Sequence, residues 1–233
     1  MFLFVTGVNF AIFPMIFRFF LKNFCKLTSF TLLLFIFINN MRLSEAKAKK
    51  VTLSQYFISE ERAEVKHEFH NGKLIPMPGG TFYNNKIINN IIFALNLALE
   101  DKEDIFHILG SDMKIFIPAW NHVVYPDAVV IARAPEFYED RKDVILNPLL
   151  IVEVLSSGTE NYDKGAKFEK YQSIPAFKEY ILVRQDKAEV LTYYREEADL
   201  WKRSDFISPD GLISLLSVAA VLEMSRIYKG VAF

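Results

Sequence analysis

Residues 149–155 (Leu-Leu-Ile-Val-Glu-Val-Leu) constrain the fold of this chain more than any other segment. Six of these seven residues are apolar. A short, nearly continuous apolar run is typical of a central strand that is buried on both faces. A strand of this kind needs neighbouring strands and covering helices, so we predict an α/β domain with a mixed β-sheet flanked by helices.

The segments around this strand have the patterns that such a domain requires. Isoleucines and leucines at helical spacing predict a long helix over residues 84–100. The Asn71-Gly72 turn predicts a hairpin over residues 68–77. The other elements are also predicted from local patterns. They are strands at 107–117, 128–132, 179–183, 188–194 and 200–203, and helices at 52–57, 60–67, 159–172 and 223–228.

The first forty residues differ in composition from the rest of the chain. They hold eleven of the 22 phenylalanines, three basic side chains and no acidic one. Residues 41–233 hold 24 basic and 28 acidic side chains, a net charge of −4. We therefore divide the chain into a hydrophobic N-terminal extension, residues 1–40, and a folded domain, residues 41–233.

Three interpretations of residues 1–40 remain open. The two apolar runs, 2–17 and 27–38, are shorter than the roughly 20 residues that a membrane-spanning helix needs. The segment is a membrane anchor or uncleaved signal, a cleaved secretory signal, or a prefix to a true start at Met41. We expect a cytoplasmic protein if the chain starts at Met41, and a membrane-associated one if the segment is retained.

The composition excludes several classes of protein. The single cysteine, Cys25, excludes a disulfide within the chain and zinc sites of the Cys₄ or Cys₂His₂ type. The formal net charge of −1 excludes a histone-like nucleic-acid binder. Glycine-rich phosphate loops and the Gly-x-Ser-x-Gly sequence are absent, and the two tryptophans form no stacking pattern.

Two acidic residues lie within or next to predicted apolar strands, where a carboxylate is unusual. Glu153 interrupts the apolar strand, and a buried carboxylate is costly unless it is paired or binds a metal. Asp127 follows Pro126 at the start of the strand predicted at 128–132. Taken alone, Glu153 could reach solvent or an arginine, and Asp127 could be a turn residue.

The helix predicted after Glu153 adds a lysine to these acids. Asp163, Lys167, Lys170 and Tyr171 have spacings that place them on one helical face. A solvated ion pair between Asp163 and Lys167 is the alternative. Taken together, two acids at the ends of neighbouring strands suit a hard cation such as Mg²⁺. A nearby lysine suits phosphodiester hydrolysis.

These motifs resemble the PD-(D/E)XK nuclease superfamily and, more closely, the Uma family, whose members are described as putative restriction endonucleases. The resemblance covers about residues 50–230. It implies a restriction-endonuclease-like fold. It is carried by Pro126-Asp127, Ile151-Val-Glu-Val-Leu-Ser-Ser157, Asp163-x-x-x-Lys167, Tyr171, Glu179-Tyr-Ile-Leu-Val183 and the entry motif Glu68-Phe-His-Asn-Gly72.

The resemblance also implies roles for individual residues. Asp127 and Glu153 would be metal ligands, and Glu68 an auxiliary catalytic acid. Leu155 stands where the superfamily usually has its lysine, so the lysine role would pass to Lys167, with Lys170 as the competitor.

The chain departs from the family at the start of the long helix. The family commonly has a histidine there, and this chain has Asn84 and Asn85. Asparagine cannot accept a proton at neutral pH, but it can cap a helix.

We therefore expect a Mg²⁺- or Mn²⁺-dependent endonuclease that hydrolyses DNA, with a homodimer as one possible state. Two alternatives remain. One is a nuclease-fold binding module that no longer cuts, and the other is a membrane-associated protein that uses residues 1–40. His67 and His70 flank Glu68 and form an i,i+3 pair that could in principle bind a metal, although surface positions are the alternative.

Overall fold

The computed structural model describes residues 50–233, and the three interpretations of residues 1–40 lie outside the described residues. Residues 51–233 form one compact unit. Within residues 50–233, the strands form two six-stranded sheets and one two-stranded sheet. None of the helices in this part of the chain is both long and apolar enough to cross a membrane.

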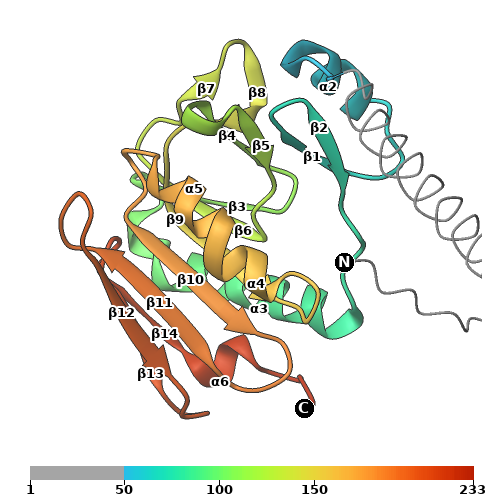
Figure 1. The fold of residues 1–233 in the computed structure, drawn as a ribbon. Helices are drawn as coiled ribbons and strands as arrows, with labels where there is room; N and C mark the ends of the chain where they lie inside the picture. The colour runs from blue at the N-terminus through green and yellow to red at the C-terminus, as the bar shows by residue number, and fades with distance from the viewer. Residues whose placement is uncertain (1–49) are drawn as a thin grey trace, which may run out of the picture. The chain divides into compact units, whose positions relative to one another are not determined.

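The first six-stranded sheet, here called the β9 sheet, has the order β12-β11-β10-β9-β6-β3 (Figure 1). β9 is parallel to β10, and the other neighbours are antiparallel. The strands are β3 (Phe106–Gly110), β6 (Ala128–Ala132), β9 (Pro148–Leu155), β10 (Glu179–Arg184), β11 (Val190–Arg195) and β12 (Trp201–Phe206). β9 is therefore a central strand, as its apolar sequence predicts, and seven of its eight residues are buried.

The second six-stranded sheet, here called the β1 sheet, has the order β2-β1-β5-β4-β8-β7. Only its β4–β8 pair is parallel. Its strands are β1 (His67–His70), β2 (Lys73–Pro76), β4 (Lys114–Ile117), β5 (His122–Val124), β7 (Phe137–Tyr138) and β8 (Arg141–Ile145). The third sheet is the hairpin of β13 (Leu212–Leu215) and β14 (Ala220–Glu223).

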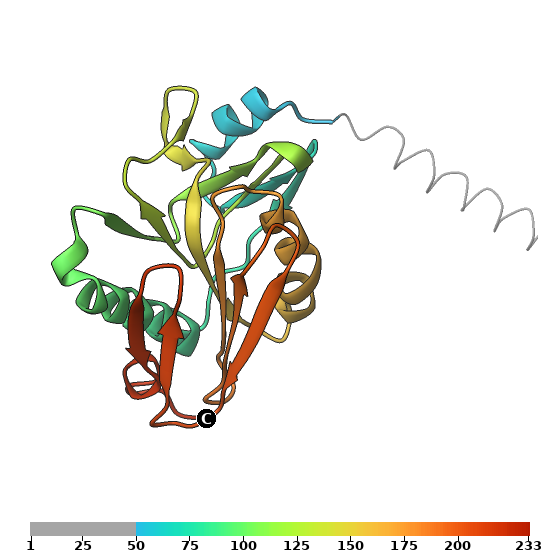
Figure 2. The same ribbon diagram turned by 90° about the vertical axis from the view of Figure 1, so that its left-hand side faces the viewer.

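Helices cover both faces of the β9 sheet (Figures 1 and 2). On one face, α3 (Phe82–Ala98) packs Ile87, Ile91 and Leu95 into a core that it shares with Val152 and Val154 of β9. The β13–β14 hairpin and α6 (Met224–Ile227) contribute to the same core.

The opposite face of the β9 sheet carries a second core. Here α5 (Phe168–Gln172) contributes Phe168 and Tyr171, which pack with Ile151 of β9 and with Ile115 and Val124 of the β1 sheet. α4 (Glu160–Tyr162) precedes α5 on this side of the β9 sheet. A third core lies between α2 (Leu53–Glu60) and the β1 sheet. The second core therefore joins the two large sheets.

Several predicted elements are confirmed within a few residues. Thr52 caps α2 through a capping box. Asn71 and Gly72 both have positive φ angles, 47° and 95°, as a tight hairpin turn requires. The predicted helix at 84–100 begins two residues earlier, because Thr81 accepts a hydrogen bond from the Asn84 N–H and caps the helix.

Other predictions are wrong in instructive ways. The charged stretch predicted as a helix at 60–67 is only the end of α2, followed by turns and by β1. The strand predicted at 107–117 is two strands, β3 and β4, and they belong to different sheets. A single mixed sheet was expected, whereas β4, β5, β7 and β8 form a second sheet together with β1 and β2.

The two faces of α3 provide a test of this packing. Ile91 is 1% exposed in the core beneath the β9 sheet, whereas Phe93 on the same helix is 63% exposed. We expect Ile91→Ala to lower the free energy of unfolding by about 2–5 kcal/mol, because it leaves a cavity. Phe93→Ala should change it by less than about 0.5 kcal/mol. Urea denaturation of the full chain measures both, and equal losses would contradict the assigned faces.

Candidate active site

A buried lysine stands at the centre of the charged residues. Lys167 is 4% exposed, and its Nζ lies 2.7 Å from Glu153 Oε1, 3.5 Å from Glu68 Oε1 and 3.8 Å from Asp163 Oδ1. It also donates a hydrogen bond of 3.4 Å to the carbonyl oxygen of Tyr125. Lys167 therefore holds together β1, β9, the segment before β6 and the helical segment after β9.

The helical segment that carries Lys167 is irregular. Residues Asp163–Lys167 form one π-helical turn between α4 and α5. Such turns are rare and often occur at functional sites. The turn buries Asp163 and Lys167. The predicted shared face is only partly right, because Tyr171 also points into the cluster but Lys170 does not.

Glu153 faces this cluster because side chains alternate along a strand. Val152 and Val154 point towards α3, whereas Ile151 and Leu155 belong to the core on the opposite side. Glu153 is 4% exposed, and the Tyr171 hydroxyl donates a hydrogen bond of 3.0 Å to its Oε1. The same carboxylate oxygen thus accepts from Tyr171 and contacts Lys167.

Asp127 lies next to Glu153 on the neighbouring strand. In the antiparallel pair of β6 and β9, Ala128 is opposite Val152, so the next position places Asp127 opposite Glu153. Residues opposite each other in such a pair project from the same face of the sheet. The Val154 N–H donates a hydrogen bond of 2.6 Å to Asp127 Oδ2. Asp127 is half-buried, whereas Glu153 is fully enclosed.

Glu68 approaches Lys167 from the other sheet. It lies in β1, is 6% exposed, and its Oε2 is 2.8 Å from His70 Nε2. The two residues are separated by one position on a strand, so their side chains lie on the same side. This spacing within a strand is the sequence signal that predicts the contact between Glu68 and His70.

His67 and His70 do not face one site, so the metal pair, the less favoured of the two interpretations, is not formed. The pair assumed helical spacing, but both residues lie in β1, where positions three apart face opposite sides. His67 Nδ1 lies 3.1 Å from Glu60 Oε2, whereas His70 contacts Glu68.

Burial and like charge shape the protonation of the acids. Burial raises the pKa of Glu153 well above its usual range, and Asp163 and Asp127 add to this rise. Burial likewise raises the pKa of Asp127 and of Asp163. Burial also opposes the charge of Glu68, but Lys167 and the hydrogen bond with His70 outweigh it and lower its pKa. Glu68 is therefore the acid held most firmly in its ionised form.

For Lys167, the neighbouring carboxylates favour the charged form, whereas burial opposes it. Burial would lower the pKa of its ammonium group, but Glu153, Glu68 and Asp163 outweigh burial and raise that pKa well above the ordinary value. Lys167 therefore carries a positive charge at neutral pH. Its single charge cannot neutralise four ionised carboxylates, and the pKa values of Asp127, Glu153 and Asp163 are raised accordingly. A divalent cation could take the place of the protons that these raised pKa values favour.

The donor set suits a hard divalent cation. Carboxylate oxygens are the ligands that Mg²⁺ and Mn²⁺ prefer, and Mg²⁺ is often held by one or two carboxylates and several waters. Among residues 50–233, no group of three or more His, Cys, Asp or Glu side chains has an arrangement that could hold a metal ion. Asp127 and Glu153 lie opposite each other on neighbouring strands.

Asn84 and Asn85, which lie where the family commonly has a histidine, contact different backbone groups. The Asn84 side-chain amide donates to the Val154 carbonyl at 3.5 Å, and the Asn85 amide donates to the carbonyls of Gly80 and Thr81. Thr81, not an asparagine, caps the helix. Asn84 therefore lies beside the strand that carries Glu153.

Known proteins resemble this chain in sequence. The family described as "Uma2: Putative restriction endonuclease" matches residues 53–225. "Uncharacterized protein sll1609" of Synechocystis sp. is 36% identical over 140 residues, which cover 60% of this chain and 78% of that protein. "Uncharacterized protein slr1290" of the same organism is 33% identical over 189 residues, 79% of this chain and 94% of that protein.

Solved structures also resemble the chain in three dimensions. One of them is the crystal structure of a "putative nuclease belonging to DUF820" from Anabaena variabilis. Its TM-score is 0.62 at 17% sequence identity, and the match covers 78% of this chain and 99% of that one. The likeness confirms the expected α/β, restriction-endonuclease-like fold. Together with the match over residues 53–225, it confirms the resemblance noted in the motifs: the chain belongs to the Uma2 family of putative restriction endonucleases.

Proposed function

We propose that this protein is a divalent-metal-dependent endonuclease that hydrolyses phosphodiester bonds of DNA. The proposal is carried by one observation: a buried, positively charged lysine contacts Glu153, which stands opposite Asp127 on the neighbouring strand. A purely structural core rarely encloses so many carboxylates around one ammonium group, because desolvating each charge is costly.

Asp127 and Glu153 would hold the cation, Mg²⁺ or Mn²⁺. When bound, such a cation polarises a phosphoryl oxygen and lowers the pKa of a bound water. Tyr171 orients Glu153 for this role through its hydrogen bond. The Val154 N–H does the same for Asp127.

Lys167 would act as a positively charged hydrogen-bond donor. Because its pKa is raised, it keeps its proton and cannot be the base that activates water at neutral pH. It can instead position the attacking water and stabilise the negative charge that develops on the pentacoordinate phosphate. Glu68 holds Lys167 in place, which makes Glu68 an auxiliary residue of the site. Lys170 is the weaker candidate, because its ammonium group faces aromatic rings and not Glu153.

Replacing Glu153 by glutamine tests the reaction. Glu153→Gln keeps the size of the side chain but removes the negative charge that pairs with Lys167, so it should lower the free energy of unfolding by up to about 3–5 kcal/mol. Nicking of supercoiled plasmid with Mg²⁺ should fall at least about 100-fold, because several kcal/mol of transition-state stabilisation are lost. Gel analysis of the plasmid and thermal unfolding of the full chain measure the two effects.

Lys164→Met is the matched control for this experiment. Lys164 lies in the same π-helical turn but pairs with Glu160, so its loss should leave nicking unchanged. The proposal fails if the wild-type protein cleaves neither plasmid nor random-sequence duplex or single-stranded DNA with either metal. It also fails if Glu153→Gln cleaves as fast as the wild type.

Metal binding should be coupled to proton release. Burial raises the pKa values of Asp127 and Glu153, so the empty site retains protons, whereas a metal ligand must be deprotonated. The affinity for Mn²⁺ should therefore increase as the pH rises through those raised pKa values. Isothermal titration in buffers of different ionisation enthalpy measures both the affinity and the released protons.

Asp127→Asn should abolish this Mn²⁺ binding and its proton release, whereas Asp112→Asn should preserve both, because Asp112 is exposed and pairs with Lys66. If Asp127→Asn binds Mn²⁺ with the affinity of the wild type, Asp127 is not a ligand of the metal. Mn²⁺ binding without cleavage of any DNA would instead favour the binding module that no longer cuts.

A further inference from the structure

An aromatic and cationic patch adjoins the Lys167 cluster. The patch consists of Trp120, Tyr162 and Lys170, with His70 and His122 behind it. These residues come from five separate elements or turns, and only the fold brings them together. We propose that this patch binds an unpaired nucleobase and its phosphate, so that the protein engages single-stranded DNA beside the reactive cluster. The proposal rests on the proposed nuclease function for its choice of DNA.

Lys170 links the two aromatic rings of the patch. Its Nζ lies 5.0 Å from the centre of the Tyr162 ring and 6.0 Å from that of the Trp120 ring. Among residues 50–233, this ammonium group forms no ion pair with a carboxylate. A cation that is held by aromatic faces and has no acidic partner remains available to a phosphate group.

Trp120 is presented to solvent by a rigid turn. It ends the 3₁₀ turn Pro118–Trp120, after which Asn121 adopts a left-handed conformation with φ 51°. The Trp120 carbonyl accepts a hydrogen bond of 2.6 Å from His122 Nδ1, and the Trp120 ring meets the His122 ring edge-on at 6.5 Å. Trp120 is nonetheless 39% exposed, so part of its ring is open to a stacking base.

A chain of contacts joins the patch to the reactive cluster. The Tyr162 hydroxyl is 3.3 Å from His70 Nε2, and the same nitrogen is 2.8 Å from Glu68, which contacts Lys167. The His70 ring also packs against the His122 ring, with 4.5 Å between the centroids. The patch therefore borders the cluster and is held in a fixed orientation to it.

The chemistry of the patch favours a single strand over a duplex. Bases stack on aromatic side chains only where the faces of the bases are free, and each stacked base contributes about 1–3 kcal/mol. A duplex hides those faces within its own stack and offers phosphates alone. A patch of two rings around one lysine matches a base with its neighbouring phosphate.

Trp120 itself can report this binding. The chain has two tryptophans, and Trp201 packs against Phe177, Phe168 and Arg195. In EDTA, which prevents metal-dependent cleavage, we expect oligothymidylate to quench the fluorescence of Trp201→Phe in a saturable way. A duplex of the same length should bind at least about fivefold more weakly, because stacking is lost. In Trp120→Phe the remaining fluorophore is the packed Trp201, so oligothymidylate should no longer quench the fluorescence. The test thus compares two variants and does not depend on the folding of either one alone.

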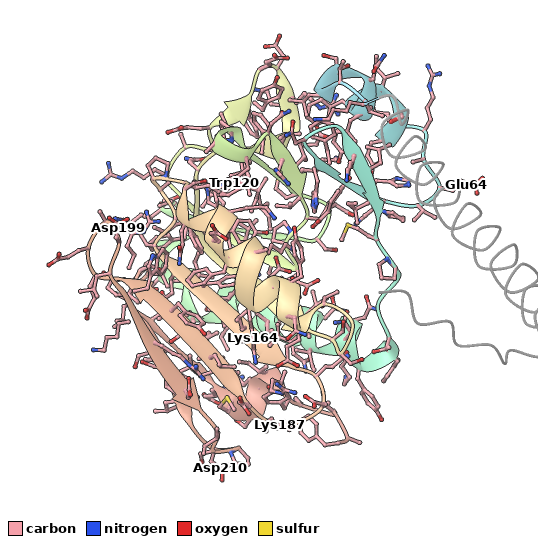
Figure 3. The ribbon with its side chains drawn as sticks, viewed as in Figure 1. Glu64, Trp120, Lys164, Lys187, Asp199 and Asp210 are labelled. Carbon is pink, nitrogen blue, oxygen red and sulfur yellow. The ribbon has the colours of Figure 1, made fainter. Side chains whose placement is uncertain are left out.

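Two lysine variants complete the test, with binding measured by fluorescence anisotropy of labelled oligothymidylate. Lys170→Met should weaken binding at least about fivefold and reduce its salt dependence, because one phosphate contact is lost. Lys187→Met is the control, since Lys187 pairs with Glu189 and lies well apart from Trp120 (Figure 3).

The outcomes separate this proposal from the proposed nuclease function. Absence of quenching, equal quenching by duplex, or tighter binding of oligouridylate would overturn the assignment of the patch to single-stranded DNA, even if plasmid nicking proceeds. Saturable quenching that requires Trp120, in a protein that cuts no DNA, would support the patch and refute only the nuclease.

Discussion

The ion pair between Lys167 and Glu153 is the interaction on which the rest of the structure depends. Both groups are almost fully buried, with Nζ and Oε1 2.7 Å apart. Removing one partner of such a pair typically costs about 3–5 kcal/mol, because the other charge is left buried and unpaired. The strand β9, the π-helical turn and, through Glu68, the strand β1 must therefore keep their relative positions.

The same interaction joins the two large sheets to the site. Glu153 comes from the β9 sheet and Glu68 from the β1 sheet, and Lys167 reaches both. The apolar core between the sheets excludes water from one side of this cluster, which raises the pKa of Glu153. Stability and chemistry thus draw on one arrangement. The neighbouring carboxylates keep Lys167 charged despite its burial, and a divalent cation could displace the protons that burial favours on those acids.

Sequence patterns predicted best those elements whose signal is local. The apolar run of β9, the turn at Asn71 and Gly72, and the apolar face of α3 depend on residues close together in the chain, and all three are present. The failures have a common cause. A charged stretch after α2 has helical composition but ends in β1, where pairing with β2 and β5 decides its conformation. Only three residues, 111–113, separate β3 from β4, yet each strand pairs within a different sheet.

The sequence by itself determined which residues could form a site: an acid before one strand, an acid within the next, and a lysine in the following helix, in an order that resembles a nuclease family. It could not choose between Lys167 and Lys170, because a regular helix would have placed both on one face. The π-helical turn and the packing of α5 against the β9 sheet decided this, since they bury Lys167 and leave Lys170 among aromatic rings. The packing of His70 against His122, behind the patch around Trp120, likewise depends on the pairing of β1 with β5, a long-range contact that no local pattern encodes.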